Sequence, residues 1–509
     1  MGQNITQKFI SIFGSKVVIL FLTVITTPII VRLLDSDGYG DYSFILSAVQ
    51  VLFILITAGS FNGIRKYIAE DRPIDGWAGS VYRFYTKVIF GITIPTIIII
   101  VGFARSDIIV SVLGKEFSPY FYIIALLLPM RAIFRTSRSA LMGLNLEHYS
   151  ESLKVLDRVI FTIFIVTFFH FGGDVEAILI GRTTAYTIVG LSAFIIFAHY
   201  VGFSTIRHIP TSLPKKKLLS YSAYSSILTF LMVSLYNLDI ILLRIMVGST
   251  ETGYYRAALV VAEFLWFVPL AVQATLVHST SRLWVEEKFN QLTVIATQVT
   301  RYTLLFLVLL VLGVMGLARP LLTTYFGPEF EAATIPLLLL LPGVLGFALI
   351  RPILAISQGQ ENLRVLILST SAAALLNFVL NISLIPLYGM NGAAIATSIS
   401  YGSMFFAHVW SARFLGFDPL ADIRFERIVL TGLIAGIPII ILPMYINSDI
   451  LALIIIPVMG FTLYSVLALK FGAIDLSEIL HLIRSSPVPM KKLTKLVPEK
   501  YGSVFRSLE

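Results

Sequence analysis

The chain has 509 residues, of which 57% are hydrophobic and 13% are charged, and its mean hydropathy is +0.87. Soluble proteins carry about 25% charged residues, so this composition excludes an ordinary soluble domain. The sequence contains no cysteine, which excludes disulfides, thiolate metal sites and cysteine nucleophiles. The formal net charge of +9 becomes informative only when the charges are placed relative to a membrane.

Apolar runs of about 20 residues, the length of a helix that crosses a bilayer, recur from one end of the chain to the other. None of them alternates in the way of a membrane β-barrel strand. The pattern predicts an all-α polytopic membrane protein with fourteen transmembrane helices, and we expect the short fifth helix to begin within 152–158. The fourteen windows are 10–32, 43–63, 85–104, 119–142, 159–171, 177–199, 219–243, 257–279, 300–318, 332–354, 365–386, 392–412, 428–446 and 450–470.

The basic residues are distributed unevenly between the two sides of the predicted membrane. We place the N-terminus inside and assign Arg32, Lys87, Arg301 and Lys470, which lie at window ends, to their flanking loops. The inner loops and tails then hold 26 of the 38 Lys and Arg residues, the outer loops hold six and the helices six. Because basic loops stay on the cytoplasmic side, this bias predicts a multi-pass protein of the cell membrane with both termini in the cytoplasm.

The two halves of the chain resemble each other. Residues 32–42 match residues 244–255 at an offset of 212, which becomes 213 after one inserted residue. Residues 113–117, Leu-Gly-Lys-Glu-Phe, match residues 326–330, Phe-Gly-Pro-Glu-Phe, again at an offset of 213. Several matches at a nearly constant offset indicate an internal duplication. Each half holds six windows and begins and ends inside, so the repeat is parallel and predicts two six-helix lobes around a central cavity.

This repeat divides the chain into five parts. The last two windows have no partner in the repeat and form an appended hairpin. The tail contains an amphipathic piece, 476–483, which would lie on anionic lipid or remain a solvated segment. The predicted parts are an N-lobe at 1–205, a basic cytoplasmic linker at 206–217, a C-lobe at 218–415, the hairpin at 416–474 and a basic cytoplasmic tail at 475–509.

Two motifs carry a family resemblance. The segment 375–401, with Asn-Gly-Ala-Ala-Ile-Ala-Thr at 391–397, closely resembles the polysaccharide-transporter (oligosaccharide flippase) branch of the multidrug/oligosaccharidyl-lipid/polysaccharide exporter superfamily. Arg-Leu-Leu at 32–34, followed by Gly-Tyr-Gly at 38–40, resembles the same family, and the likeness covers residues 8–470. The resemblance implies that the protein flips a polyprenyl-(pyro)phosphate-linked oligosaccharide to the outer leaflet by alternating access, for surface polysaccharide or glycoprotein glycan assembly. The alternative is a cation-coupled exporter of drugs or small molecules from the same superfamily.

The fourth window contains three arginines, Arg131, Arg135 and Arg138. The spacing i, i+4, i+7 places all three on one face of a helix. An arginine near the bilayer centre costs at least about 2.5 kcal/mol and cannot deprotonate to avoid that cost. We therefore expect the stripe to face a wet cavity and bind an anionic substrate, although an early helix end with snorkelling side chains is the simpler alternative. The repeat offset of 213 pairs Arg138 with Arg351, which we expect at the same depth.

Other polar residues in the windows extend the predicted substrate site. Lys16 and Arg182 would add positive charge for a phosphate group, although Lys16 is close enough to the inner face to snorkel. Polar and aromatic side chains in the second lobe would contact sugar, but each of them also fits an ordinary interhelical hydrogen bond. These are Tyr221, Tyr224, Tyr236, Asn237 and Gln273.

Two carboxylates, Asp239 and Glu263, lie in the predicted spans of the second lobe. A carboxylate within the membrane is typical of proton or sodium coupling, so we predict both as ion-coupling residues. Asp239 lies near the outer end of its helix, where simple solvation is the preferred explanation. Glu263 lies about two turns into its helix.

The sequence predicts a transporter and not an enzyme. It contains no paired carboxylates in a metal-binding context, no His/Asp cluster and no Gly-rich phosphate loop, and its seven histidines are scattered. We expect no cofactor, no metal and no nucleic-acid partner. The expected partners of a monomeric protein are the anionic lipid-linked oligosaccharide, membrane lipid and a coupling proton or sodium ion.

Overall fold

A computed structural model describes residues 5–57, 59–70, 72, 76–203, 205, 213–359 and 364–478. All regular structure in these ranges is helical, and eleven of the helical stretches are long and apolar enough to cross a membrane, which confirms an all-α multi-pass membrane protein. The elements are α1 (Ile5–Thr57), α2 (Ser60–Ala69), α3 (Trp77–Ala104), α4 (Asp107–Val112), α5 (Phe117–Gly143), α6 (Glu147–Phe171), α7 (Val175–Val201), α9 (Lys215–Met246), α10 (Ser249–Glu263), η1 (Phe264–Trp266), α11 (Phe267–Val285), α12 (Phe289–Tyr325), η2 (Pro328–Ala333), α13 (Thr334–Gln358), α14 (Arg364–Phe414), α15 (Phe425–Ile441), η3 (Leu442–Tyr445) and α16 (Asp449–Lys470).

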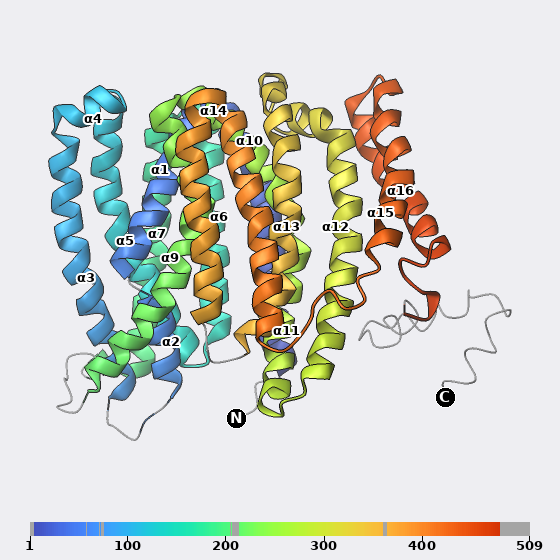
Figure 1. Cartoon of the computed structure of the whole chain (residues 1–509). Helices are drawn as coiled ribbons and strands as arrows, with labels where there is room; N and C mark the ends of the chain where they lie inside the picture. The colour runs from blue at the N-terminus through green and yellow to red at the C-terminus, as the bar shows by residue number, and fades with distance from the viewer. Residues whose placement is uncertain are drawn as a thin grey trace. The chain divides into compact units, whose positions relative to one another are not determined.

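The helices form two compact units. The first unit comprises Met1–Trp266, Leu322–Ile350 and Glu361–Ser411. Within it, α1 packs against α6, α9 and α10, and α5 packs between α3 and α7, with the short α4 at the turn from α3 to α5 (Figure 1). This packing places α1, α2, α5 and α9 around one cavity.

The second unit comprises Phe267–Leu321, Arg351–Gln360 and Ala412–Glu509. Its helices α15 and α16 lie side by side, as the predicted hairpin requires (Figure 1). Arg301 of α12 is only 1% exposed and donates to Asp422 Oδ2 at 2.7 Å and to Glu478. This cluster fixes the segment after α16 to α12. The amphipathic piece predicted at 476–483 lies mostly outside the described residues, as does most of the linker at 206–217.

Two helices are too long to be single spans. Helix α1 has 53 residues and α14 has 51, so they would be about 80 Å and about 77 Å long if straight, more than twice the hydrocarbon thickness. Each contains one residue with non-helical geometry, Asp35 (φ 52°, ψ −173°) in α1 and Gly389 (φ 55°, ψ −133°) in α14. The chain reverses at these residues, and Figure 1 shows α14 folded back on itself. Each helix therefore accommodates two of the predicted windows.

Several predicted boundaries differ from the structure; for example, the window 257–279 contains the end of α10 at Glu263, η1 and the start of α11. The second window was extended to 63, but α1 ends at Thr57, and Gly59, with a φ of 66°, separates it from α2. The helix of the fifth window begins at Glu147, before the predicted start within 152–158. Charged residues occupy the first turns of α6, so we assigned them to a loop, whereas they continue the helix and pair with neighbouring helices.

A close approach of two helices depends on two glycines, Gly40 in α1 and Gly253 in α10. A methyl group on Gly40 would lie 1.9 Å from the carbonyl oxygen of Ser249, and one on Gly253 would lie 2.1 Å from the carbonyl oxygen of Ser36. The contact is reciprocal, since both glycines and both serines are 213 residues apart. Only residues without a side chain allow backbones to approach so closely.

Hydrogen bonds from α9 and α10 to α1 reinforce the close approach of α1 and α10. Arg244 at the end of α9 donates to Asp41 Oδ1 at 2.5 Å, and Ser249 Oγ donates to the same oxygen at 2.8 Å. Thr250 donates to Asp37. The glycines and these bonds together hold α1 against α9 and α10 at this end of the first unit.

Candidate functional site

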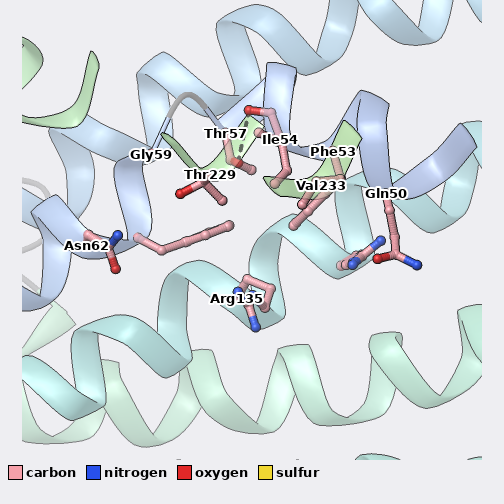
Figure 2. Close-up of a pocket in the computed structure, with 11 residues that line it drawn as sticks. Gln50, Phe53, Ile54, Thr57, Gly59, Asn62, Arg135, Thr229 and Val233 are labelled. Carbon is pink, nitrogen blue, oxygen red and sulfur yellow. Dashed lines mark hydrogen bonds between the residues drawn. The ribbon is translucent and has the colours of Figure 1, made fainter. Parts of the chain in front are cut away.

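A cavity of about 330 Å³ lies within the first unit, and Figure 2 shows its walls. Helices α1, α2, α5 and α9 and the turn between α1 and α2 supply the lining. Two arginines of α5 are the only charged residues among the lining residues, and none is acidic. The lining residues are Gln50, Phe53, Ile54, Thr57, Gly59, Phe61, Asn62, Arg131, Arg135, Thr229 and Val233.

Arg131 and Arg135 are one helical turn apart, so they lie on the same face of α5. This face lines the cavity. The Arg131 guanidinium carbon lies 4.3 Å from the centre of the Phe53 ring, and that of Arg135 lies 5.1 Å from the centre of the Phe61 ring. Neither guanidinium forms an ion pair or a hydrogen bond with another described residue. A guanidinium keeps its charge in proteins and carries five N–H donors, so both side chains can bind an anion in the cavity.

The third arginine of the predicted stripe, Arg138, is not among the lining residues. Its Nη2 lies 2.6 Å from Glu151 Oε1 of α6, and its Nε donates to the carbonyl of Ser150 at 3.2 Å. The other oxygen of Glu151 accepts from Ser15 of α1 at 2.8 Å. Arg138 therefore links α5 to α6 and, through Glu151, to α1. Its role as a substrate ligand stays a prediction.

Arg182 also has a carboxylate partner. Its Nη1 lies 3.4 Å from Asp157 Oδ2, and its Nη2 donates to the Tyr186 hydroxyl at 2.7 Å. Nearby, Arg158 of α6 donates to Thr23 Oγ1 at 2.8 Å. The fifth window began at 159, and the expected start of its helix within 152–158 left Arg158 at the boundary between the inner loop and the helix. The helical spacing of Arg158 from Lys154, i to i+4, was a signal that could have placed it within the membrane.

The other predicted ligands are placed as follows. Lys16 is exposed on α1. Arg351 is buried in α13 and belongs to the second unit, so its position relative to Arg138 stays a prediction. Asn237 is buried and donates to the carbonyl of Val233 in its own helix at 2.8 Å, a bond within α9 and not the interhelical bond that we had weighed against sugar binding.

The predicted aromatic contacts to sugar are only partly described. Tyr236 packs against Trp266 and Phe347 with both pairs of ring centres 5.6 Å apart, which makes it part of an aromatic cluster. The side chains of Tyr221 and Tyr224 lie outside the described residues.

The environment of Asp239 contradicts the expectation that this carboxylate is simply solvated. Its residue is only 1% exposed, so that explanation is wrong. Its carboxylate accepts hydrogen bonds from the Tyr255 hydroxyl, from Thr397 Oγ1 at 3.2 Å and from the backbone N–H of Ile240 at 2.9 Å. These partners lie on α9, α10 and α14, and such long-range contacts are not visible in the sequence around Asp239.

Glu263 is the last residue of α10 and is half-buried. Its Oε1 lies 3.4 Å from Nη1 of Arg256, which is seven residues, or two turns, earlier on the same helix. The structure therefore places the two predicted ion-coupling carboxylates in separate environments, one bonded to hydroxyl groups and the other paired with an arginine.

A family model described as "Polysaccharide biosynthesis protein" matches residues 5–276, more than half of the chain. The chain belongs to this family. The matched region contains every residue that lines the cavity.

Two curated relatives come from Haloferax volcanii. The protein named "Probable flippase AglR" is 23% identical over 406 residues, which cover 76% of this chain and 79% of AglR. The protein named "Probable low-salt glycan biosynthesis flippase Agl15" is 22% identical over 503 residues, which cover 96% of this chain and all of Agl15. Among solved structures, the lipid II flippase MurJ in an inward-closed conformation has a similar fold, with a TM-score of 0.72, 15% identity and coverage of 92% of this chain and 98% of MurJ.

Proposed function

We propose that the protein is a flippase that moves a polyprenyl-(pyro)phosphate-linked oligosaccharide from the cytoplasmic to the outer leaflet by alternating access. The observation that carries the proposal is the cavity lined by Arg131 and Arg135, neither of which forms an ion pair with a described carboxylate. Guanidinium forks bind phosphate oxygens bidentately, and these charge-assisted bonds are strong in a low dielectric. The flippase names of the two relatives and the fold of MurJ support the same function.

The position of the two arginines along α5 fits this route. With the N-terminus in the cytoplasm, α5 enters the membrane from outside near Pro119. Arg131 is then about 18 Å along the helix, near the midplane, and Arg135 is about 6 Å closer to the cytoplasm. An anionic head group that comes from the cytoplasmic side would meet Arg135 first and Arg131 at the bilayer centre, while its polyprenyl tail stays in lipid.

The proposal includes fourteen transmembrane helices. Eleven stretches are long and apolar enough, and two of them, in α1 and α14, contain a reversal that supports two spans each. Helix α6 has 25 residues and would be the fourteenth span, although its charged first half keeps it out of the apolar set. The reciprocal contact between Gly40 and Gly253 supports the parallel repeat of two lobes, 1–205 and 218–415, followed by the hairpin at 416–474.

Alternating access gives the reciprocal contact between Gly40 and Gly253 a role in transport. In the proposed topology it lies at the outer end of the membrane, where it closes the path between the lobes. Release of the head group to the outside requires α1 to separate from α10, which breaks the bonds from Ser249 to Asp41 and from Thr250 to Asp37. Asp239 and Glu263 are the residues that we propose to couple this motion to a proton or a sodium ion. A charged carboxylate in the membrane is costly, and the hydrogen bonds of Asp239 come from two hydroxyl groups and a backbone N–H.

A cation-coupled drug exporter is the alternative function. Such a protein needs acidic groups for its cationic substrates, but the cavity is lined by two cations and by no carboxylate. This charge pattern favours an anionic substrate.

The test is a flipping assay in proteoliposomes with a fluorescent diphosphate-linked oligosaccharide. The double variant R131Q/R135Q should lose most of the flipping, since a hydrogen bond to a charged group contributes about 1.5–3 kcal/mol. The matched control is R105Q, because Arg105 is exposed at the end of α3 and lies outside the cavity. Native-rate flipping by a correctly inserted double variant would refute the proposed site, and transport of cationic drugs in place of the glycolipid would favour the alternative.

A further inference from the structure

Two phenylalanines lie against the cavity arginines. Phe53 is 3% exposed near the end of α1, and Phe61 is half-buried at the start of α2. Their rings are stacked, with centres 5.7 Å apart and planes at 25°. Figure 2 shows Phe53 on the wall opposite Arg135, with the turn at Gly59 between α1 and α2. They are the only aromatic residues among those that line the cavity.

The spacing of the rings matches the spacing of the arginines. Arg131 and Arg135 are four residues apart, which is about 6 Å along a helix axis. The two ring centres are 5.7 Å apart, so each ring faces one guanidinium, Phe53 at 4.3 Å and Phe61 at 5.1 Å. Phe53 and Phe61 come from different helices, and the turn at Gly59 brings their rings together. The match is therefore a property of the folded site and not of a single helix face.

A ring holds a guanidinium differently from a carboxylate. The negative face of the ring attracts the cation, but it accepts none of the in-plane N–H bonds and brings no formal charge. Two other arginines of the first unit are held by carboxylates: Arg138 by Glu151 and Arg244 by Asp41. A carboxylate beside Arg131 or Arg135 would compete with an anionic ligand for the same donors. Two rings fix the guanidinium positions and leave the donors and the net charge available.

We propose that Phe53 and Phe61 are positioning residues that hold Arg131 and Arg135 in register for the anionic head group through the negative faces of their rings. The inference rests on the proposed function for the identity of the ligand. It assigns a role in the site to two apolar residues that would otherwise be counted as packing. The rings do not touch the phosphate; they act through the two arginines.

The test changes the electrostatics of the ring without changing its shape. Phenylalanines with one, two, three and five fluorines, introduced at position 53 or 61, weaken and finally invert the charge of the ring face. The affinities of the full-length protein for inorganic pyrophosphate and for the diphosphate-linked oligosaccharide should fall stepwise with each fluorine, by a total of about twofold to thirtyfold. F53L should lose a similar factor, whereas F53W should retain binding because it keeps an aromatic face.

A matched control and a background variant separate this role from packing. Phe164 and Phe168 of α6 form a similar ring pair, with centres 5.9 Å apart, and neither ring faces an arginine of the described ranges. Fluorination at Phe164 should therefore leave binding unchanged. In an R131Q background, fluorination at Phe53 should have no further effect, because the cation on which the ring acts is absent.

The outcomes distinguish the two proposals. If the native protein flips the glycolipid but fluorination at both positions changes neither affinity, the positioning role is refuted and the flippase function stands. If an equal loss appears in the native and R131Q backgrounds, the ring is a packing residue and the inference is also refuted. If pyrophosphate binding follows the fluorine series but no glycolipid is flipped, the positioning role stands and the proposed function is refuted.

Discussion

The close contact between Gly40 and Gly253 gives a prediction whose size follows from the structure. An alanine at Gly40 places a methyl group 1.9 Å from the carbonyl oxygen of Ser249, whereas ordinary contact begins at 3.4 Å. Helices α1 and α10 must therefore separate locally by about 1.5 Å, the difference between these distances. Overpacking of this kind costs about 1–3 kcal/mol. A change of 2 kcal/mol alters the equilibrium about thirtyfold, so a closed outer end populated at about 99:1 would fall to about 3:1.

Cross-linking measures this change directly, because the chain contains no native cysteine. Cysteines at Asp37 and Thr250, whose side chains are hydrogen-bonded, should be joined rapidly by a short bifunctional thiol reagent. G40A should slow that cross-linking severalfold. The control G91A places its methyl group in open space on α3 and should cross-link at the parent rate. If G40A cross-links as fast as the parent, the glycine contact does not hold the outer end closed.

Three further predictions test other parts of the account. R138Q should destabilise the protein by about 3–5 kcal/mol, measured as a lower thermal midpoint in detergent, because it leaves the buried carboxylate of Glu151 without its cation; an unchanged midpoint would contradict the linking role. A cysteine at Asn447 should react with an impermeant maleimide in intact cells and one at Glu287 should not, and the reverse pattern would refute the topology. D239N should flip the glycolipid without the ion dependence of the native protein while it still binds substrate, and an unchanged dependence on pH and sodium would make Asp239 structural.

The sequence predicted the part of the site that depends on helical periodicity. Arg131 and Arg135 share a face because they are one turn apart, and this relation survives in the folded chain. The same spacing placed Arg138 beside them, but its partner Glu151 comes from the next helix, and only tertiary packing brings the two together. Periodicity within one window carries no information about a carboxylate in another.

Two features of the site had no usable signal in the sequence. The chain has 37 phenylalanines, nearly all of which fit apolar windows, so nothing distinguished Phe53 and Phe61 from residues that face lipid. Asp239 is buried by partners that lie 16 and 158 residues away, Tyr255 and Thr397, and its place near a helix end suggested solvent instead. In both cases the decisive contact joins different helices.

The charge dependence of flipping at the two cavity arginines is the most direct measurement of the central claim. Variants R131K, R131Q and R131E, and the same three at Arg135, are reconstituted at equal inserted amounts and compared with R105Q in the proteoliposome assay. Lysine should keep part of the activity because it keeps the charge but not the bidentate fork, glutamine should lose about tenfold to a hundredfold, and glutamate should abolish flipping. If correctly inserted glutamine variants at both positions flip the lipid-linked oligosaccharide at the native rate, the cationic cavity is a packing feature and the account is wrong.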